Sequence, residues 1–106
     1  MTEEHIIQNK IREALSPYAV IFRANVGSGV TYDGRHFDTG LPKGFSDLFG
    51  FRKSDGKAVF IEVKTPTGRV SPEQKNFINR MKEHGAVAGV CRSPEDALQL
   101  IGVVKK

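Results

Sequence analysis

The chain has 106 residues, a formal net charge of +4 and a pI near 9.4. This length fits one domain with a modest core, and the basic excess favours a polyanionic partner such as nucleic acid. No apolar run approaches the roughly 20 residues of a membrane span, the acidic start MTEEH is not that of a signal peptide, and the single cysteine excludes a disulfide framework. We therefore expect one domain over residues 1–106, located in the cytoplasm and without membrane attachment.

The first predicted element is a helix over residues 3–15. Thr2 is a suitable N-cap, and Ile7 and Ile11 begin an apolar stripe at helical spacing. Glu4 lies at the edge of that stripe, where a surface acid favoured by the helix dipole is the simplest interpretation. Gln8 lies one turn further along and is expected to share the face of Glu4.

A strand is predicted next, over residues 18–25. Arg23 and Asn25 lie near its end and are candidates for phosphate contacts, although ordinary exposure to solvent explains them equally well. Residues 26–46 contain five glycines and no periodicity, so we expect a long loop without regular structure. Its mixture of aromatic and basic residues, including Lys43, is typical of loops that contact nucleic acid. A mobile loop whose aromatic residues fold back on the domain remains the alternative.

The central prediction is a pair of antiparallel strands over residues 48–51 and 58–65, joined by a short loop that contains Asp55-Gly56, a strong hairpin signal. Asp47 precedes the first strand, and Glu62 and Lys64 lie near the end of the second. An antiparallel pairing therefore brings these three side chains to one edge of a sheet. The second strand begins apolar on both of its faces, so it is expected to be covered on both sides.

Two carboxylates and one lysine at such an edge suit a divalent metal. Carboxylate oxygens are preferred ligands of Mg²⁺, which keeps several of its waters. The lysine is placed to act on one of those waters or on a phosphate. An isolated Glu-x-Lys pattern is nevertheless common on solvated strands, so the spacing alone leaves both interpretations open.

The remaining elements complete one mixed sheet with helices on its faces. A polar turn carrying Arg69 leads to a helix that opens with Ser71-Pro72 and has Gln74 as its capping-box partner. Lys75 helps to make this helix basic. A strand over 86–92 and a final helix after Ser93-Pro94 follow. The order α-β-β-β-α-β-α predicts an α/β fold with a central mixed four-stranded sheet flanked by helices.

At these residues the chain resembles a known family. The segments GFSD at 44–47 and IEVK at 61–64 resemble the PD-(D/E)xK nuclease superfamily, and within it the small VRR-NUC domains, especially the stand-alone versions found in phages. The resemblance extends to residues 4–8, 71–74, 85–90 and 93–97. Ser46 departs from the family pattern, which usually has proline before the aspartate. The resemblance implies a restriction-endonuclease-like αβββαβα core.

The resemblance also implies roles for individual residues. Asp47 and Glu62 would hold Mg²⁺, with Mn²⁺ able to substitute, and Lys64 would act on the attacking water. The Val63 carbonyl and Glu4 would complete the metal site, and Gln74 would lie near the metal-bound water or the scissile phosphate. The expected contacts to nucleic acid are Arg23, Asn25, Lys43, Ser46, Gln8, Arg69 and Lys75.

The implied function is a Mg²⁺-dependent endonuclease that hydrolyses phosphodiester bonds in branched DNA such as four-way (Holliday) junctions. A homodimer is expected, because a junction is cut on two opposed strands. Its contact could involve Ile6, or Phe37 and Leu41 of the long loop. The alternatives are a nuclease that acts on flap or duplex DNA and a non-catalytic module that binds nucleic acid.

Overall fold

The computed structural model describes residues 2–24, 28–38 and 40–103. Its elements follow the chain as α1 (Glu3–Leu15), β1 (Ala19–Arg23), β2 (Ser28–Val30), β3 (His36–Asp38), β4 (Leu48–Arg52), β5 (Ala58–Val63), α2 (Pro72–Glu83), β6 (Val87–Cys91) and α3 (Pro94–Leu100). Among the described residues, no helix is both long and apolar enough to cross a membrane.

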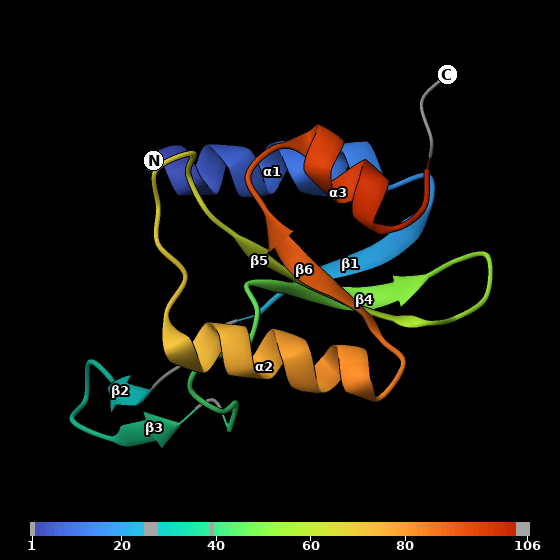
Figure 1. The fold of residues 1–106 in the computed structure, drawn as a ribbon. Coiled ribbons are helices and arrows are strands. Elements are labelled where there is room, and N and C mark those ends of the chain that lie inside the picture. The colour runs from blue at the N-terminus through green and yellow to red at the C-terminus, as the bar shows by residue number, and fades with distance from the viewer. Residues whose placement is uncertain (1, 25–27, 39, 104–106) are drawn as a thin grey trace.

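The main sheet has four strands in the order β1-β4-β5-β6. β1 and β5 both pair antiparallel with β4, and β6 pairs parallel with β5. Helices α1 and α3 cover one face of the sheet and α2 covers the other (Figure 1). This arrangement confirms the predicted α/β class with a central mixed sheet, and its element order is the restriction-endonuclease-like αβββαβα core with one hairpin inserted after β1.

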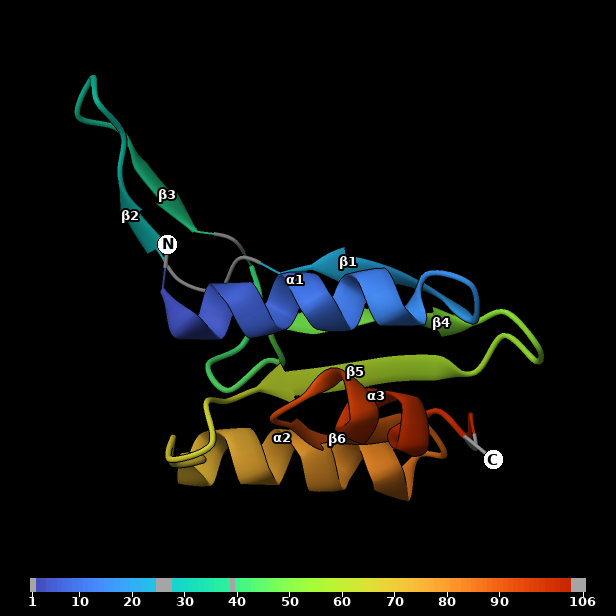
Figure 2. The same ribbon diagram turned by 90° about the horizontal axis from the view of Figure 1, so that it is seen from above.

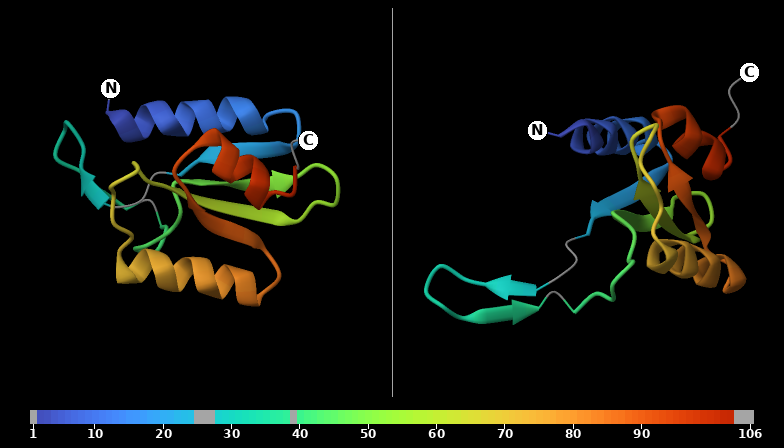
Figure 3. Two further views of the ribbon diagram at one scale, coloured as in Figure 1. Left: turned by 45° about the horizontal axis from the view of Figure 1, so that its top comes forward. Right: turned by 60° about the vertical axis from the view of Figure 1, so that its left-hand side comes forward.

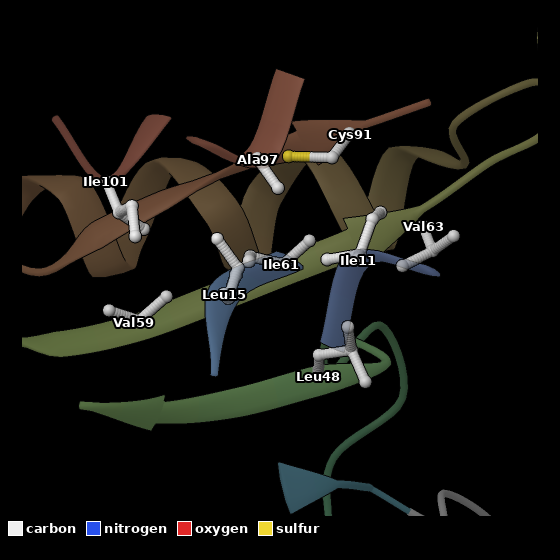
Figure 4. Packing of buried hydrophobic residues seen from close by; sticks show 9 residues of the cluster. All are labelled: Ile11, Leu15, Leu48, Val59, Ile61, Val63, Cys91, Ala97 and Ile101. Carbon is white, nitrogen blue, oxygen red and sulfur yellow. The ribbon is translucent and has the colours of Figure 1, made fainter. Parts of the chain in front are cut away.

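The core lies between the sheet and the pair α1 and α3. Val59, Ile61 and Val63 alternate along β5 and are fully buried on this face, opposite Ile11 and Leu15 of α1 (Figure 4). Burying a side chain of this size contributes roughly 1.5–3 kcal/mol to stability. Because β5 lies inside the sheet and beneath two helices, the residues at its end have a rigid support.

Aromatic rings fill the opposite face, under α2. Phe60 of β5 packs edge-on against Phe77 of α2, with ring centroids 5.5 Å apart. Phe45 contacts Phe77, Phe60 and Phe49, with centroids 4.9, 5.9 and 5.6 Å away. Phe45 is therefore anchored between helix and sheet, and it fixes the segment that leads into β4.

Each helix begins at a side-chain cap that accepts a backbone N–H group. The cap contacts are His5 N to Thr2 Oγ1 at 3.2 Å, Gln74 N to Ser71 Oγ at 3.1 Å, and Asp96 N to Ser93 Oγ at 3.1 Å. Such caps typically contribute about 1 kcal/mol each. The predicted starts of all three helices are confirmed.

The segment 26–46 was predicted to lack regular structure, and this is wrong for part of it. β2 and β3 pair antiparallel, with Ser28 opposite Asp38 and Val30 opposite His36. The tip between them is closed by Gly34, at a φ of +88°, and by an ion pair between Arg35 and Asp33 at 2.7 Å. Strands of three residues are too short to give a readable alternation. We call residues 28–38 the arm, and it stands off the body in every view (Figures 2 and 3).

Candidate active site

Asp47 reaches across from the start of β4 to the end of β5. The register pairs Leu48 with Ile61, which places Asp47 beside the last residues of β5. Its Oδ2 atom accepts the backbone N–H of Val63 at 2.9 Å, and its carbonyl accepts the N–H of Ala24 at 2.8 Å. The expected meeting of the strand ends is therefore present in the structure.

Glu62 is the most unusual residue of the site, because it is a carboxyl group with only 2% of its surface exposed. The pKa of Glu62 is raised from 4.5 to about 8, chiefly by burial and next by the negative charge of nearby Asp47, against the opposing effect of Lys64. Its Oε1 atom accepts a hydrogen bond from Gln74, whereas its Oε2 atom is buried and receives no N–H donor among the described residues; a further contact of the Glu62 side chain is with the carboxyl group of Asp47. An unpartnered buried carboxylate oxygen is costly.

A divalent cation fits this pair of acids. It would give Glu62 Oε2 a partner and would offset the repulsion between the charges of Glu62 and Asp47. Two carboxylates with the remaining positions filled by water are a usual Mg²⁺ site. The adjoining cavity has a volume of about 310 Å³, which leaves room for coordinated waters and a phosphate. Its lining residues are Ala24, Lys43, Gly44, Phe45, Asp47, Glu62, Ser71 and Gln74.

Gln74 uses both ends of its side-chain amide. Its Oε1 atom accepts the backbone N–H of Ser71 at 2.9 Å, as predicted for a capping box, and its Nε2 atom donates to Glu62 Oε1 at 2.6 Å. The contact with Glu62 was not predicted. The cap orients the amide so that its NH₂ group faces the acid, and Gln74 thereby leaves Glu62 Oε2 as the free atom.

Gly44 brings the loop that precedes β4 against the first turn of α2. Its φ is +91°, and a Cβ at this position would lie 2.6 Å from the carbonyl oxygen of Glu73. Only glycine avoids both the strained backbone conformation and the clash. Lys43 is exposed at the mouth of the cavity, with its Nζ atom 3.9 Å from Glu73 Oε1. The close approach fixes one wall of the cavity.

Lys64 follows the last residue of β5 and is half-buried. Its backbone N–H donates to the carbonyl of Cys91 at 3.1 Å, which extends the contact between β5 and β6 beyond the strands. Its positive charge lowers the pKa of Glu62, so it lies close to the acid, although it does not line the cavity. The spatial grouping of Asp47, Glu62 and Lys64 agrees with the sequence prediction.

Two residues of α1 fit the prediction less well. The charge of Glu4 raises the pKa of Glu62, which places Glu4 at the same end of the molecule. However, no three His, Cys, Asp or Glu side chains are grouped to hold a metal ion anywhere in the described ranges. Glu4 therefore does not join Asp47 and Glu62 as a ligand in this arrangement. Gln8 is only 5% exposed, on the buried stripe with Ile11, so it presents little surface for the predicted contact with nucleic acid.

Ser46 also differs from its prediction. Its side chain is fully buried, and its hydroxyl donates to the carbonyl of Leu48 at 3.0 Å, so it has no surface with which to contact DNA. Arg23 is exposed at the end of β1, and its Nη2 atom lies 3.4 Å from Nε2 of His5. Arg69 and Lys75 are exposed as well. Asn25 lies outside the described residues.

One residue near the site was missed by the sequence analysis. Arg92 follows β6, and its Nη1 atom donates to the carbonyls of Thr65 and Gly68, just after Lys64. A usable signal existed, because the ends of neighbouring parallel strands meet at the same edge of a sheet. β6 was predicted to end at Arg92, but its parallel pairing with β5 was not assigned.

Comparisons with known proteins agree with this arrangement. The family profile described as the VRR-NUC domain matches residues 33–95. A solved structure titled "VRR_NUC domain" superposes with a TM-score of 0.66 at 23% sequence identity, covering 95% of this chain and 96% of that chain. At this identity the superposition establishes a shared fold. No curated protein matches the chain in sequence.

Proposed function

The chain belongs to the VRR-NUC family, a nuclease family of the PD-(D/E)xK type, and we propose that residues 1–106 act as one Mg²⁺-dependent endonuclease domain that hydrolyses phosphodiester bonds in branched DNA. The observation that carries the proposal is the unpartnered buried Oε2 atom of Glu62 beside Asp47. Buried polar atoms normally have a hydrogen-bond partner in the protein or in ordered water. A buried carboxylate oxygen that has no protein donor and lies near a second carboxylate suits a bound cation.

The metal would be held by carboxylate oxygens of Asp47 and Glu62, with the Val63 carbonyl as a further oxygen ligand. When bound, it would polarise the phosphate and lower the pKa of a coordinated water. Mn²⁺ has the same preference for oxygen ligands and should substitute. Asp47 is already oriented by the N–H of Val63, and Glu62 by the amide of Gln74. The site therefore needs little rearrangement to accept the ion.

Lys64 would supply positive charge at the point of attack. Its ammonium group would orient the attacking water and stabilise the charge that develops on the phosphate. Glu4 would not bind the metal but would act from a greater distance, because its negative charge raises the pKa of Glu62. Lys43 at the cavity mouth, together with Arg23, Arg69 and Lys75 as exposed cations, would contact the DNA backbone on either side of the cut.

Assembly into a homodimer is supported by the position of the exposed apolar residues. On the sheet face that α2 leaves open, Phe22 is 50% and Phe51 43% exposed, and both belong to β1 or β4, whereas α2 packs on β5 and β6. Tyr18 precedes the same edge, and Val30 and Tyr32 lie on the arm, which projects past β1 (Figure 2). An exposed patch of this kind is typical of an interaction site.

The orientation of that face also suits branched DNA. If two copies pack through the open face of β1 and β4 about a twofold axis parallel to the strands, both cavities open at the same end of the dimer. Both active sites could then face one junction at the same time and cut two opposed strands without dissociation of the dimer. This interface replaces the contacts suggested by the sequence: Ile6 lies on α1, Leu41 is half-buried, and the Phe37 side chain lies outside the described part of the chain.

The proposal is tested by cleavage of labelled four-way junction, flap, single-stranded and duplex DNA, each with Mg²⁺, with Mn²⁺ and with a chelator. We expect paired incisions in the junction, with either metal and not with chelator. Preference for flap or duplex DNA would overturn the substrate assignment. Binding of junctions without any cleavage would instead identify a non-catalytic module.

A further inference from the structure

A side chain outside the cavity holds the turn that follows β5. Arg92 comes immediately after β6, and its Nη1 atom donates to the carbonyl of Thr65 at 2.5 Å and to that of Gly68 at 2.8 Å. The turn is closed within itself by a bond from Gly68 N to Thr65 O at 3.1 Å. The guanidinium group thus spans both ends of the turn.

This turn folds back over Lys64. A Cβ built at Gly68 would lie 3.5 Å from the Cβ of Lys64 and 3.1 Å from Thr65 Oγ1, so the backbone of the turn packs directly against the root of the lysine side chain. The N–H of Lys64 donates to Cys91, the residue before Arg92. Two consecutive residues at the end of β6 therefore hold this region: Cys91 bonds to the backbone of Lys64, and Arg92 bonds to the turn that covers it.

Arg92 is itself held in place by α3. Its backbone N–H donates to Asp96 Oδ2 at 2.9 Å, and Asp96 N donates to the N-cap hydroxyl of Ser93 at 3.1 Å. A chain of hydrogen bonds leads from the first turn of α3 through Arg92 to the turn after β5. Both bonds come from the single Nη1 atom, whose two hydrogens are fixed in the plane of the guanidinium group, whereas the hydrogens of a lysine ammonium group rotate freely.

We propose that Arg92 is a positioning residue for Lys64. The inference rests on the proposed role of Lys64 in phosphodiester hydrolysis. Arg92 holds the Thr65–Gly68 turn, and the turn limits the directions that the Lys64 side chain can take. Without the guanidinium group the two carbonyls lose their donor, the turn relaxes, and the ammonium group of Lys64 spreads over more positions. A misplacement of about 1 Å at a reacting group can cost roughly 100-fold in rate.

Cleavage kinetics distinguish this role from a DNA contact. For Arg92→Ala we expect kcat to fall by roughly 10- to 100-fold, with KM and its salt dependence close to those of the wild type. Arg92→Lys should recover part of the rate, because an ammonium group can still donate to one carbonyl. A raised KM with a flatter salt dependence would overturn the proposal and identify Arg92 as a phosphate contact.

Arg52 provides a matched control. It donates from Nη1 to the carbonyl of Ile101 at 3.0 Å and pairs with Asp55, at the end of β4 remote from Asp47. Arg52→Ala removes a comparable arginine clamp and should lower the melting temperature while leaving kcat unchanged. If both alanine variants lose the same fraction of kcat, Arg92 acts only through general stability and the proposal fails.

A second measurement does not depend on nuclease activity. Amide hydrogen exchange at Gly68 and Lys64 should accelerate in Arg92→Lys, because both N–H groups belong to the clamped segment, whereas exchange in α1 should be unchanged. Unchanged protection at these two amides would refute the proposal that Arg92 holds the turn beside Lys64. If the wild type shows no cleavage but exchange at Gly68 and Lys64 is faster in Arg92→Lys, the proposed function fails, whereas the role of Arg92 in holding the Thr65–Gly68 turn is supported.

Discussion

The Nε2 atom of Gln74 donates to Oε1 of Glu62 at 2.6 Å, while Oε1 of the same glutamine accepts the N–H of Ser71 at 2.9 Å. One side chain therefore both closes the N-terminus of α2 and orients the buried acid. The two functions use different atoms, so a substitution can remove one and keep the other.

Gln74→Glu makes this separation. A glutamate can still accept the N–H of Ser71, because Ser-x-x-Glu is an ordinary capping box, but it offers Glu62 no donor and adds a third negative charge. We expect metal affinity in isothermal titration to fall by about tenfold or more, with α2 still formed in circular dichroism. Ser71→Ala is the control: it should cost about 1 kcal/mol of stability and change metal affinity less. Wild-type affinity in Gln74→Glu would show that the amide does not orient the acid.

The raised pKa of Glu62 predicts how the metal-free protein responds to pH. Because the folded-state pKa, about 8, lies above the ordinary 4.5, folding favours the protonated acid. Stability from this group is complete below pH 4.5 and is lost as the pH rises towards 8, by at most about 1.4 kcal/mol per pH unit. Chemical unfolding in chelator should show this decline in the wild type and not in Glu62→Gln. Added Mg²⁺ should restore stability at the upper end in the wild type only.

Asp47 has two roles, as a proposed ligand and as the acceptor for Val63 N. Asp47→Asn keeps an acceptor and removes the charge that repels Glu62, so its metal-free stability should equal or exceed that of the wild type. Asp47→Ala leaves a backbone N–H without its partner, at a cost of about 1–3 kcal/mol. Both variants should abolish cleavage. Thermal unfolding in chelator separates them, and cleavage at the wild-type rate by either would refute the metal assignment.

Substitution of Lys64 should lower the cleavage rate more than the affinity for DNA. Lys64→Ala is expected to lower the single-turnover cleavage rate by about 100-fold or more, with little change in DNA affinity. Lys43→Ala, at the exposed mouth of the cavity, should do the reverse and flatten the salt dependence of binding. Fluorescence anisotropy and quenched-flow cleavage on one junction measure both quantities. Loss of affinity without loss of rate in Lys64→Ala would make it a backbone contact.

The proposed dimer can be tested by adding one charge to the open face. Phe51 and Ile6 are almost equally exposed, at 43% and 42%, but Phe51 lies on the open face of β4 and Ile6 lies on α1. Phe51→Asp should convert the protein to a monomer in light scattering at micromolar concentration, because an interface does not accept a buried unpaired charge. Ile6→Asp should remain dimeric. A dimeric Phe51→Asp together with a monomeric Ile6→Asp would instead indicate that the interface involves α1.

The parts of the fold with strong local signals were predictable from the sequence. The capping residues Thr2, Ser71 and Ser93 defined the helix starts, and the alternation along β5 defined the buried strand. The meeting of Asp47 with the end of β5 followed from the hairpin signal alone. These are short-range features, and the sequence carries them directly.

Features that depend on contacts between distant segments were not predictable. In the sequence Ser46 resembles an ordinary loop residue, and its burial and the bond from its hydroxyl to the Leu48 carbonyl became visible only in the structure. The partnership of Gln74 with Glu62 joins residues on different elements, and local spacing gives no sign of it. Gln8 is different, because its spacing of three from Ile11 and seven from Leu15 already placed it on the buried stripe.

The body holds the chain firmly at one point before the arm and at one point after it. Ala24 on one side is bonded to Asp47, and Gly44 on the other is pressed against the first turn of α2. Because these anchors do not depend on the sequence of the arm, residues 28–38 should accept insertions and exchanges at little cost to the candidate active site. A combinatorial library confined to residues 28–38 is therefore expected to change substrate preference while leaving the proposed metal site intact. This hairpin is accordingly the segment that we would randomise first in laboratory evolution of new substrate preferences.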